Sequence, residues 1–124
     1  MKKLINLFLF CLLSAGLFQF ANAEGKSIKT NEDLLECLEA DKRTTEQNAN
    51  GADYARSNFG LGFIVGVVQE NQLSENLICV PDGVSNEQGA RIVRKYLNDN
   101  PEKGHHPAAE GVVTALSKAF PCHK

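Results

Sequence analysis

The side chains that could perform chemistry in this 124-residue chain are mainly cysteines and histidines. Cys37 would be the nucleophile of a hydrolase, but Asp33, Glu36 and Glu39 flank it on the same predicted helix. Their negative charge disfavours the thiolate that such a reaction needs. We therefore interpret Cys37 as a core or dimer-interface residue, and we predict no catalytic residue and no enzyme.

Histidines could bind a metal ion, and His105 and His106 are adjacent. Neighbouring residues seldom point the same way, and no acidic residue or cysteine stands near them at a ligand spacing. His123 lies near the C-terminal end and would need ligands from elsewhere. We expect His106 to cap the next helix and His105 to face solvent, and we predict no metal and no cofactor.

The first residues follow the pattern of a secretory signal peptide. Lys2 and Lys3 precede an apolar run over residues 4–18, and the small residues Ala21 and Ala23 form a cleavage site. The apolar run is shorter than the roughly 20 residues of a membrane-spanning helix. We predict cleavage after Ala23, no membrane attachment afterwards, and a single domain over residues 24–124.

An exported chain meets an oxidising compartment, where cysteines pair. Cleavage removes Cys11 and leaves Cys37, Cys79 and Cys122, so three pairings are possible. Prolines flank both Cys79 and Cys122, which mark the two ends of one helical unit, and we therefore favour a Cys79–Cys122 disulfide.

The charge balance argues against two classes of partner. Cleavage takes away two of the 13 basic residues and none of the 15 acidic ones, which leaves a net charge of about −4. No basic stretch remains to neutralise phosphates or anionic lipid headgroups. Nucleic acid and membrane surfaces are therefore not expected partners.

Hydrophobic periodicity predicts an all-α domain of four to five helices stapled by a disulfide. The first helix begins at a Thr30 or Asn31 cap and ends near Lys42 or Arg43. The second covers residues 52–69, and its length favours a helix over a strand. It should cross the centre of the domain or a subunit interface, with an apolar stripe at Ala55, Phe59, Phe63, Gly66 and Val67.

Two further helices have clear termini. Ser85 and Gln88 form a capping-box pattern for a helix that buries Ile92, Val93, Tyr96 and Leu97. Pro107 begins the last helix in its first turn, and Pro121 ends it. This helix is expected to bury Ala109, Val112, Val113, Leu116 and Phe120.

Two polar loops remain, over residues 44–51 and 98–106. A loop held at both ends by helices loses little entropy when it docks into another protein. We expect the second loop and the exposed side of the helix before it to contact a partner. The predicted contact residues are Asn98, Asp99, Asn100, Glu102, Lys103 and His105.

Several short motifs occur in a fixed order along the chain: GLGFIVGV at 60–67, ICVPDGV at 78–84, YL and NP at 96–101, PA at 107–108, AL at 115–116 and AFPC at 119–122. Together they resemble the periplasmic immunity proteins against type VI secretion amidase effectors. The resemblance covers about residues 33–122.

This resemblance implies a helical, disulfide-containing periplasmic homodimer. Such a protein binds a peptidoglycan amidase effector and covers its Cys/His active site, which protects the producing cell. Family members often carry a cysteine at the position of Gly60, where it would pair with the one matching Cys37. The alternative interpretation is a small periplasmic chaperone or stress-response binding protein.

Overall fold

The computed structural model describes residues 27–122 of the chain, and the predicted signal peptide lies outside these residues. The described helices are α2 (Asn31–Thr45), α3 (Gly51–Ser74), α4 (Asn86–Asp99), the short 3₁₀ helix η1 (Pro101–Lys103) and α5 (Ala108–Ala119). Within this part of the chain, extended pairing is limited to two isolated bridges, between Thr30 and Pro107 and between Ile78 and Pro121. The all-α prediction is therefore confirmed.

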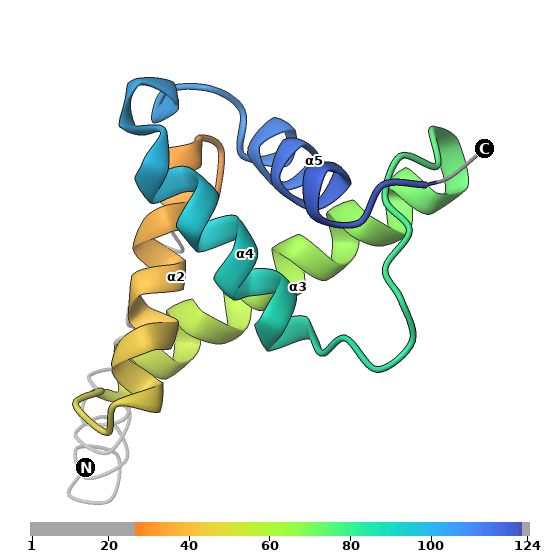
Figure 1. Cartoon of the computed structure of the whole chain (residues 1–124). Coiled ribbons are helices and arrows are strands. Elements are labelled where there is room, and N and C mark those ends of the chain that lie inside the picture. Colours follow the sequence, from red (N-terminus) through yellow and green to blue (C-terminus); the bar gives the residue numbers. More distant parts are fainter. Residues whose placement is uncertain (1–26, 123–124) are drawn as a thin grey trace, which may run out of the picture.

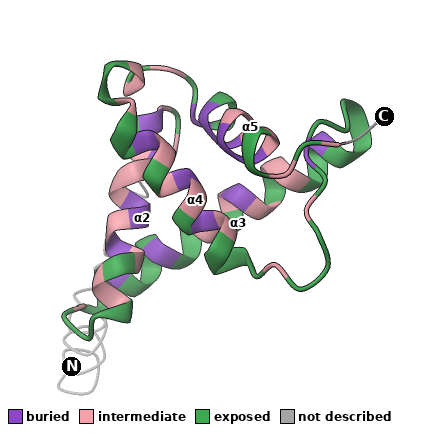
Figure 2. Ribbon diagram, viewed as in Figure 1, coloured by how far each residue is buried: buried purple, intermediate pink, exposed green. Residues whose placement is uncertain are grey.

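The long helix α3 runs from the lower end of α2 to the end of the molecule where the C-terminus lies (Figure 1). The other helices pack against it and against one another, and their facing sides carry the buried residues (Figure 2). Leu34, Leu38, Ile64, Val93 and Leu116 are among the residues of this core. No described helix has the length and apolar character that crossing a membrane requires.

Helix α2 begins with a complete capping box. Thr30 accepts a hydrogen bond from the Asp33 backbone N–H, and the Asp33 carboxylate accepts one from the Thr30 N–H at 3.0 Å. The helix continues to Thr45 rather than ending near Arg43, because Thr44 and Thr45 donate to the Asp41 carbonyl and continue the last turn. The loop predicted over residues 44–51 shortens accordingly.

An ion pair fixes the connection between α2 and α3. The Arg43 guanidinium donates to Asp53 Oδ1 at 2.6 Å and 3.1 Å, and the Asn50 N–H donates to Asp53 Oδ2 at 3.2 Å. The hydrogen bond from Arg43 has the largest effect on the pKa of Asp53 and lowers it below its usual value, and the bond from the Asn50 N–H lowers it further. Deeper along the same contact, Ser57 donates to Asp41 at 2.8 Å.

The buried face of α3 differs from the one predicted. The structure buries Asp53, Ser57, Gly60, Ile64 and Asn71, whereas Phe59 is 52% exposed and Gly66 faces solvent. The reason is the close approach of α2, which leaves no room for a β-carbon at position 60 and supplies polar partners for Asp53 and Ser57. Helix α3 also extends to Ser74, five residues beyond its predicted end.

Helices α4 and α5 follow their predictions with three corrections. Ser85 caps α4 by accepting from the Gln88 N–H at 3.2 Å, but its side chain interacts with Glu87 rather than with the Gln88 side chain. A backbone hydrogen bond first, and the Ser85 hydroxyl second, lower the pKa of Glu87. Pro107 is the N-cap of α5 rather than its first residue. Ala109 is exposed, because Ala108 and Gly111 take the buried positions of that first turn.

The Cys79–Cys122 disulfide is present, as predicted, with 4.9 Å between the two Cα atoms. The neighbouring bridge between Ile78 and Pro121, and the bond from the Cys79 N–H to the Phe120 carbonyl at 2.9 Å, align the two chain segments beside it. Cys37 is buried on α2 and lies outside this disulfide.

Candidate functional site

The predicted contact loop connects α4 to α5 and lies beside the start of α2, far from the disulfide (Figure 1). Helix α4 ends at Asp99, η1 follows, and the chain then turns into α5. The loop therefore contains a short helix of its own rather than an irregular segment.

The backbone of α2 anchors this loop. Asn31 and Glu32 occupy the first turn of α2, where backbone N–H groups have no partner within the helix. Asn31 N–H donates to the His106 carbonyl at 2.9 Å, and Glu32 N–H donates to the Gly104 carbonyl at 3.0 Å. The Asn31 side chain adds a bond to the Lys103 carbonyl at 2.8 Å. The loop carbonyls thus accept hydrogen bonds from N–H groups at the start of α2, and the same bonds hold the loop in one conformation.

Three of the six predicted contact residues have structural roles. Asn100 donates to the Tyr96 carbonyl at 2.7 Å, and Asp99 pairs with Lys95 at 2.6 Å. The Lys103 ammonium lies 3.3 Å from the Tyr96 hydroxyl and 5.6 Å from the ring centroid. These contacts hold the end of α4 and η1 in place.

The other three predicted residues are exposed, and so is Asp99, whose side chain remains 56% accessible in its ion pair with Lys95. Asn98 is exposed and donates to Glu39 of α2 at 3.2 Å. Glu102 and His105 are also exposed. The structure therefore brings Asn98, Glu102 and His105 to the surface of one rigid loop, where a partner could reach them.

A groove beside this loop extends the candidate surface onto α2. One cavity of about 240 Å³ is lined by Asn31, Glu32, Leu35, Leu97, Asn98, Pro101 and Gly104. Glu32 and Leu35 also line a second hollow, which continues along α2 past Asp33, Glu36, Glu39 and Arg43. Sequence reasoning missed this side because acidic helix faces are usually only solvated.

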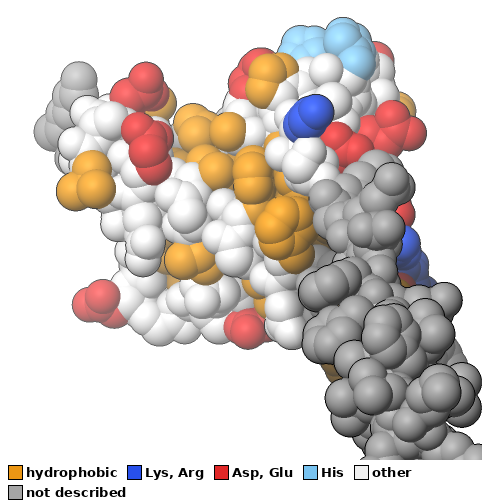
Figure 3. Space-filling model, turned by 180° about the vertical axis from the view of Figure 1, so that it is seen from behind, with side chains coloured by type: hydrophobic (Ala, Val, Ile, Leu, Met, Phe, Trp, Pro, Cys, Tyr) orange, Lys and Arg blue, Asp and Glu red, His pale blue; other side chains and the backbone are white. Residues whose placement is uncertain are grey.

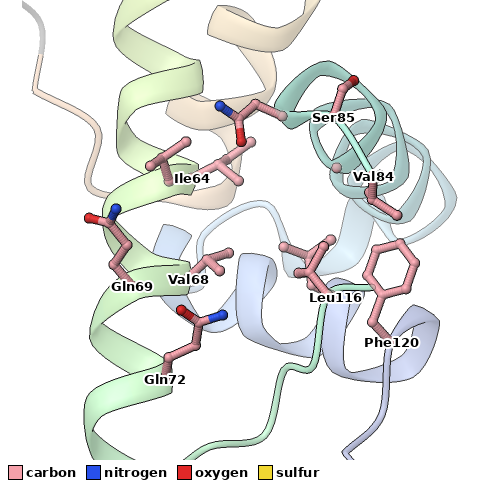
Figure 4. Close-up of a pocket in the computed structure, with 12 residues that line it drawn as sticks. Ile64, Val68, Gln69, Gln72, Val84, Ser85, Leu116 and Phe120 are labelled. Atoms are coloured by element: carbon pink, nitrogen blue, oxygen red, sulfur yellow. The ribbon is translucent and has the colours of Figure 1, made fainter. Parts of the chain in front are cut away.

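A third hollow, of about 220 Å³, lies at the other end of the domain. Ile64 and Val68 extend into it from α3 toward Leu116, while Val84 and Phe120 close the far side (Figure 4). This hollow is mainly apolar, in contrast to the loop surface. It arises where residues 79–85 lead into α4, a long-range arrangement that no local pattern signals.

The histidines of the loop form a small cluster with one acid. The rings of His105 and His106 lie edge to face with centroids 4.7 Å apart, and His106 Nδ1 is 3.3 Å from Glu110 in the first turn of α5. His106 therefore contacts the start of α5 through a side chain, whereas the backbone of Pro107 forms the cap. Within residues 27–122, no group of three His, Cys, Asp or Glu side chains is arranged to hold a metal ion.

A family model for Rap1a immunity proteins matches residues 30–122 of the sequence. The chain belongs to the Rap1a immunity protein family. The matched range begins at the cap of α2 and ends at the second cysteine of the disulfide, so it spans the helical domain described above.

No curated protein matches this Rap1a immunity protein, and no solved structure matches it. Family membership makes the chain an immunity protein, whose role is to bind a secreted effector. Proteins of this kind generally act by binding rather than by catalysis.

Proposed function

We propose that this Rap1a immunity protein is exported to the periplasm and binds a peptidoglycan amidase effector of type VI secretion. The bound protein covers the Cys/His active site of the amidase and protects the cell that makes it. The protein performs no chemistry itself, and it acts as a homodimer.

The observation that carries this proposal is the anchored loop of residues 98–106. Its carbonyls accept hydrogen bonds from Asn31 and Glu32 at 2.8–3.0 Å, so its shape is set before any partner binds. A preorganised loop avoids the entropic cost of ordering on docking, which leaves more of the interaction energy as affinity. Asn98, Glu102 and His105 would make the contacts, and the groove along α2 would accept the rim of the amidase cleft.

The test uses residues 24–124 and a secreted Cys/His amidase encoded beside the gene. We expect calorimetry to give one amidase per chain, with a dissociation constant in the nanomolar range typical of tight inhibitors. The same complex should lose hydrolysis of purified cell wall. If the amidase neither binds nor loses activity at micromolar concentrations of the immunity protein, the proposed function is wrong.

The apolar hollow favours a second candidate function, that of a periplasmic chaperone. Its lining of Val68, Val84, Leu116 and Phe120 could receive apolar side chains of an unfolded client. This candidate predicts that the protein suppresses aggregation of a reduced, unfolded client at low pH. Light scattering that is unchanged by a tenfold molar excess of the protein would remove it.

A further inference from the structure

Three segments of the fold bring two lysines to one tyrosine. Tyr96 lies on α4, Lys103 on η1 and Lys118 in the last turn of α5. The Lys103 ammonium is 5.6 Å from the centroid of the Tyr96 ring, and the Lys118 ammonium is 5.3 Å from it. Both distances are within the range of a cation–π interaction, which extends to about 6 Å. We call these three residues the lysine–tyrosine cluster.

The cluster has hydrogen-bond donors that are not used within the described part of the chain. Lys103 donates to the Tyr96 hydroxyl oxygen over 3.3 Å, so the hydroxyl hydrogen remains available to another acceptor. Among residues 27–122, neither ammonium of the cluster is paired with a carboxylate, whereas Lys95 pairs with Asp99 at 2.6 Å. Two like charges beside one ring also repel each other. An anion beside the ring would accept from all three groups and offset this repulsion.

The surroundings of the cluster limit the kind of anion. No basic stretch continues from the two lysines, so a polyanion such as nucleic acid would gain little. The mature chain carries a net charge of about −4, and acidic side chains are spread over the face seen from behind (Figure 3). An acidic group is therefore repelled by most of this molecule and attracted where the two cations converge. A single carboxylate, whose two oxygens accept several hydrogen bonds, matches the cluster.

We propose that the lysine–tyrosine cluster binds a carboxylate of the partner protein, from an aspartate or glutamate side chain on the amidase surface. The carboxylate accepts from the Tyr96 hydroxyl and from the ammonium groups of Lys103 and Lys118. Lys103 directly follows Glu102 on η1, so a partner that contacts the anchored loop also reaches the cluster. The identity of the partner rests on the proposed function, whereas the carboxylate site itself does not.

The carboxylate site is tested first without the amidase. Isotopically labelled protein, residues 24–124, is titrated at low salt with a tetraglutamate peptide that is blocked at both ends, and the binding is followed by NMR. We expect saturable shifts at Tyr96, Lys103 and Lys118, with a dissociation constant in the millimolar range. A blocked tetraglutamine peptide is the control and should leave these signals in place.

Variants separate binding from a purely structural role. The Lys103→Gln, Lys118→Gln double variant removes both charges and should lose the response to tetraglutamate. Tyr96→Phe keeps the ring and removes only the hydroxyl, so it should weaken peptide binding about threefold with an unchanged Tm. Lys42→Gln is the matched control, because it removes a charge from the exposed last turn of α2, and it should respond as wild type does. A cluster that only holds the helices together would lower Tm in the double variant without changing peptide binding.

The same variants are then compared in binding to the amidase by calorimetry. The double variant should bind about tenfold more weakly than wild type, because two charge pairs are lost. This difference should shrink at high salt, which screens exposed charges. Lys42→Gln should bind the amidase as wild type does.

Two outcomes would overturn the inference: tetraglutamate that shifts no signal of the cluster, or an amidase that binds wild type and the double variant equally. In both cases the proposed function stands if wild type still inhibits the amidase. A response to cell-wall stem peptides but not to tetraglutamate would overturn the assignment to a protein carboxylate. If tetraglutamate binds at the cluster and the amidase does not bind at all, the proposed function is wrong and the carboxylate site remains.

Discussion

Gly60 of α3 lies so close to Cys37 of α2 that a β-carbon added to Gly60 would be 2.8 Å from the Cys37 β-carbon. The β-carbons of a disulfide are about 3.5–4.5 Å apart. A separation of the two helices by on the order of 1 Å would therefore allow a bond between these positions. The resemblance noted in the sequence implies a cysteine at position 60 in related proteins, and the structure places that position directly against Cys37.

Gly60→Cys should form a second disulfide with Cys37 after oxidation, because the two side chains would share one small space. Gly60→Ala is the control: it adds the β-carbon without the bond and should destabilise the fold by about 1–3 kcal/mol through overpacking. Mass spectrometry after thiol alkylation counts the disulfides, and thermal melts compare the variants. A cysteine variant whose two thiols both remain alkylated in oxidising buffer would contradict this prediction.

Gly111 of α5 is a second position where no side chain fits. A β-carbon there would contact Asn31 Oδ1, would lie 2.9 Å from Asn31 Cγ and would lie 3.1 Å from Leu97 Cδ2. Asn31 cannot easily move, since its amide holds the Lys103 carbonyl. We expect Gly111→Ala to lower stability by roughly 1–3 kcal/mol. A β-carbon at Gly89 would meet nothing within 4 Å, so Gly89→Ala should instead raise the free energy of unfolding by up to about 1 kcal/mol. Urea titrations of both variants and of wild type measure these changes.

Cys122→Ser removes the disulfide to Cys79. The bond joins residues 43 positions apart, so its loss should cost up to about 4 kcal/mol by the chain-entropy model and lower Tm by up to roughly 16–32 °C. Wild type melted in reductant should behave in the same way. Equal Tm values for the variant and the oxidised wild type would show that the disulfide does not stabilise the domain.

The Arg43–Asp53 pair predicts a dependence on acid. The pKa of Asp53 is lowered in the fold by the Arg43 hydrogen bond first, so the stabilisation is present above the unfolded value of about 3.9 and is lost as pH falls through the folded value. Asp53→Asn should melt at a lower temperature than wild type at pH 7 and lose less stability between pH 5 and 2. Asp82→Asn, on the exposed turn before α4, should follow wild type across this range.

The loop surface gives a prediction for binding. Glu102 is exposed on η1 and lies in the first turn of that helix, where its charge can change without disturbing the bonds that hold the loop. Glu102→Lys should weaken binding to the amidase about tenfold, or roughly 1.4 kcal/mol, with an unchanged helical spectrum. Glu75→Lys, at the far end of α3, should bind as wild type does. If the two variants bind the amidase with equal affinity, the contact must lie elsewhere, and the loop before α3 is the next candidate.

The elements predicted correctly from sequence are those that local patterns determine. The Thr30 and Ser85 caps, and the proline-flanked cysteines, each act within a few residues or mark the ends of a unit. The buried face of α3 could not be predicted in this way. Its hydrophobic residues lie on nearly all sides, so the choice depends on α2, whose Asp41 and Arg43 provide partners for Ser57 and Asp53.

The candidate site was also predicted only in part, because some of its features depend on contacts between distant segments. The polar composition of residues 98–106 identified an exposed loop, but its rigidity depends on carbonyl groups, which every residue has. The bonds from Asn31 and Glu32 join segments about 70 residues apart, and no side-chain pattern reveals them. Of the apolar stripe predicted on α3, Phe63 and Val67 pack against the core, whereas Ala55, Phe59 and Gly66 are exposed, and the sequence pattern alone does not separate the two groups.

The disulfide between Cys79 and Cys122 closes a covalent ring that contains α4, η1 and α5. A force applied between residues 30 and 122 would therefore stretch only the segment before the ring. The sequence separation of 43 between the two cysteines corresponds to about 150 Å of extended chain, and this length would not contribute to the measured extension until the disulfide is reduced. Under tension, α2 and α3 can therefore be extended, whereas the segment that contains α4, η1 and α5 cannot be extended while the disulfide is intact.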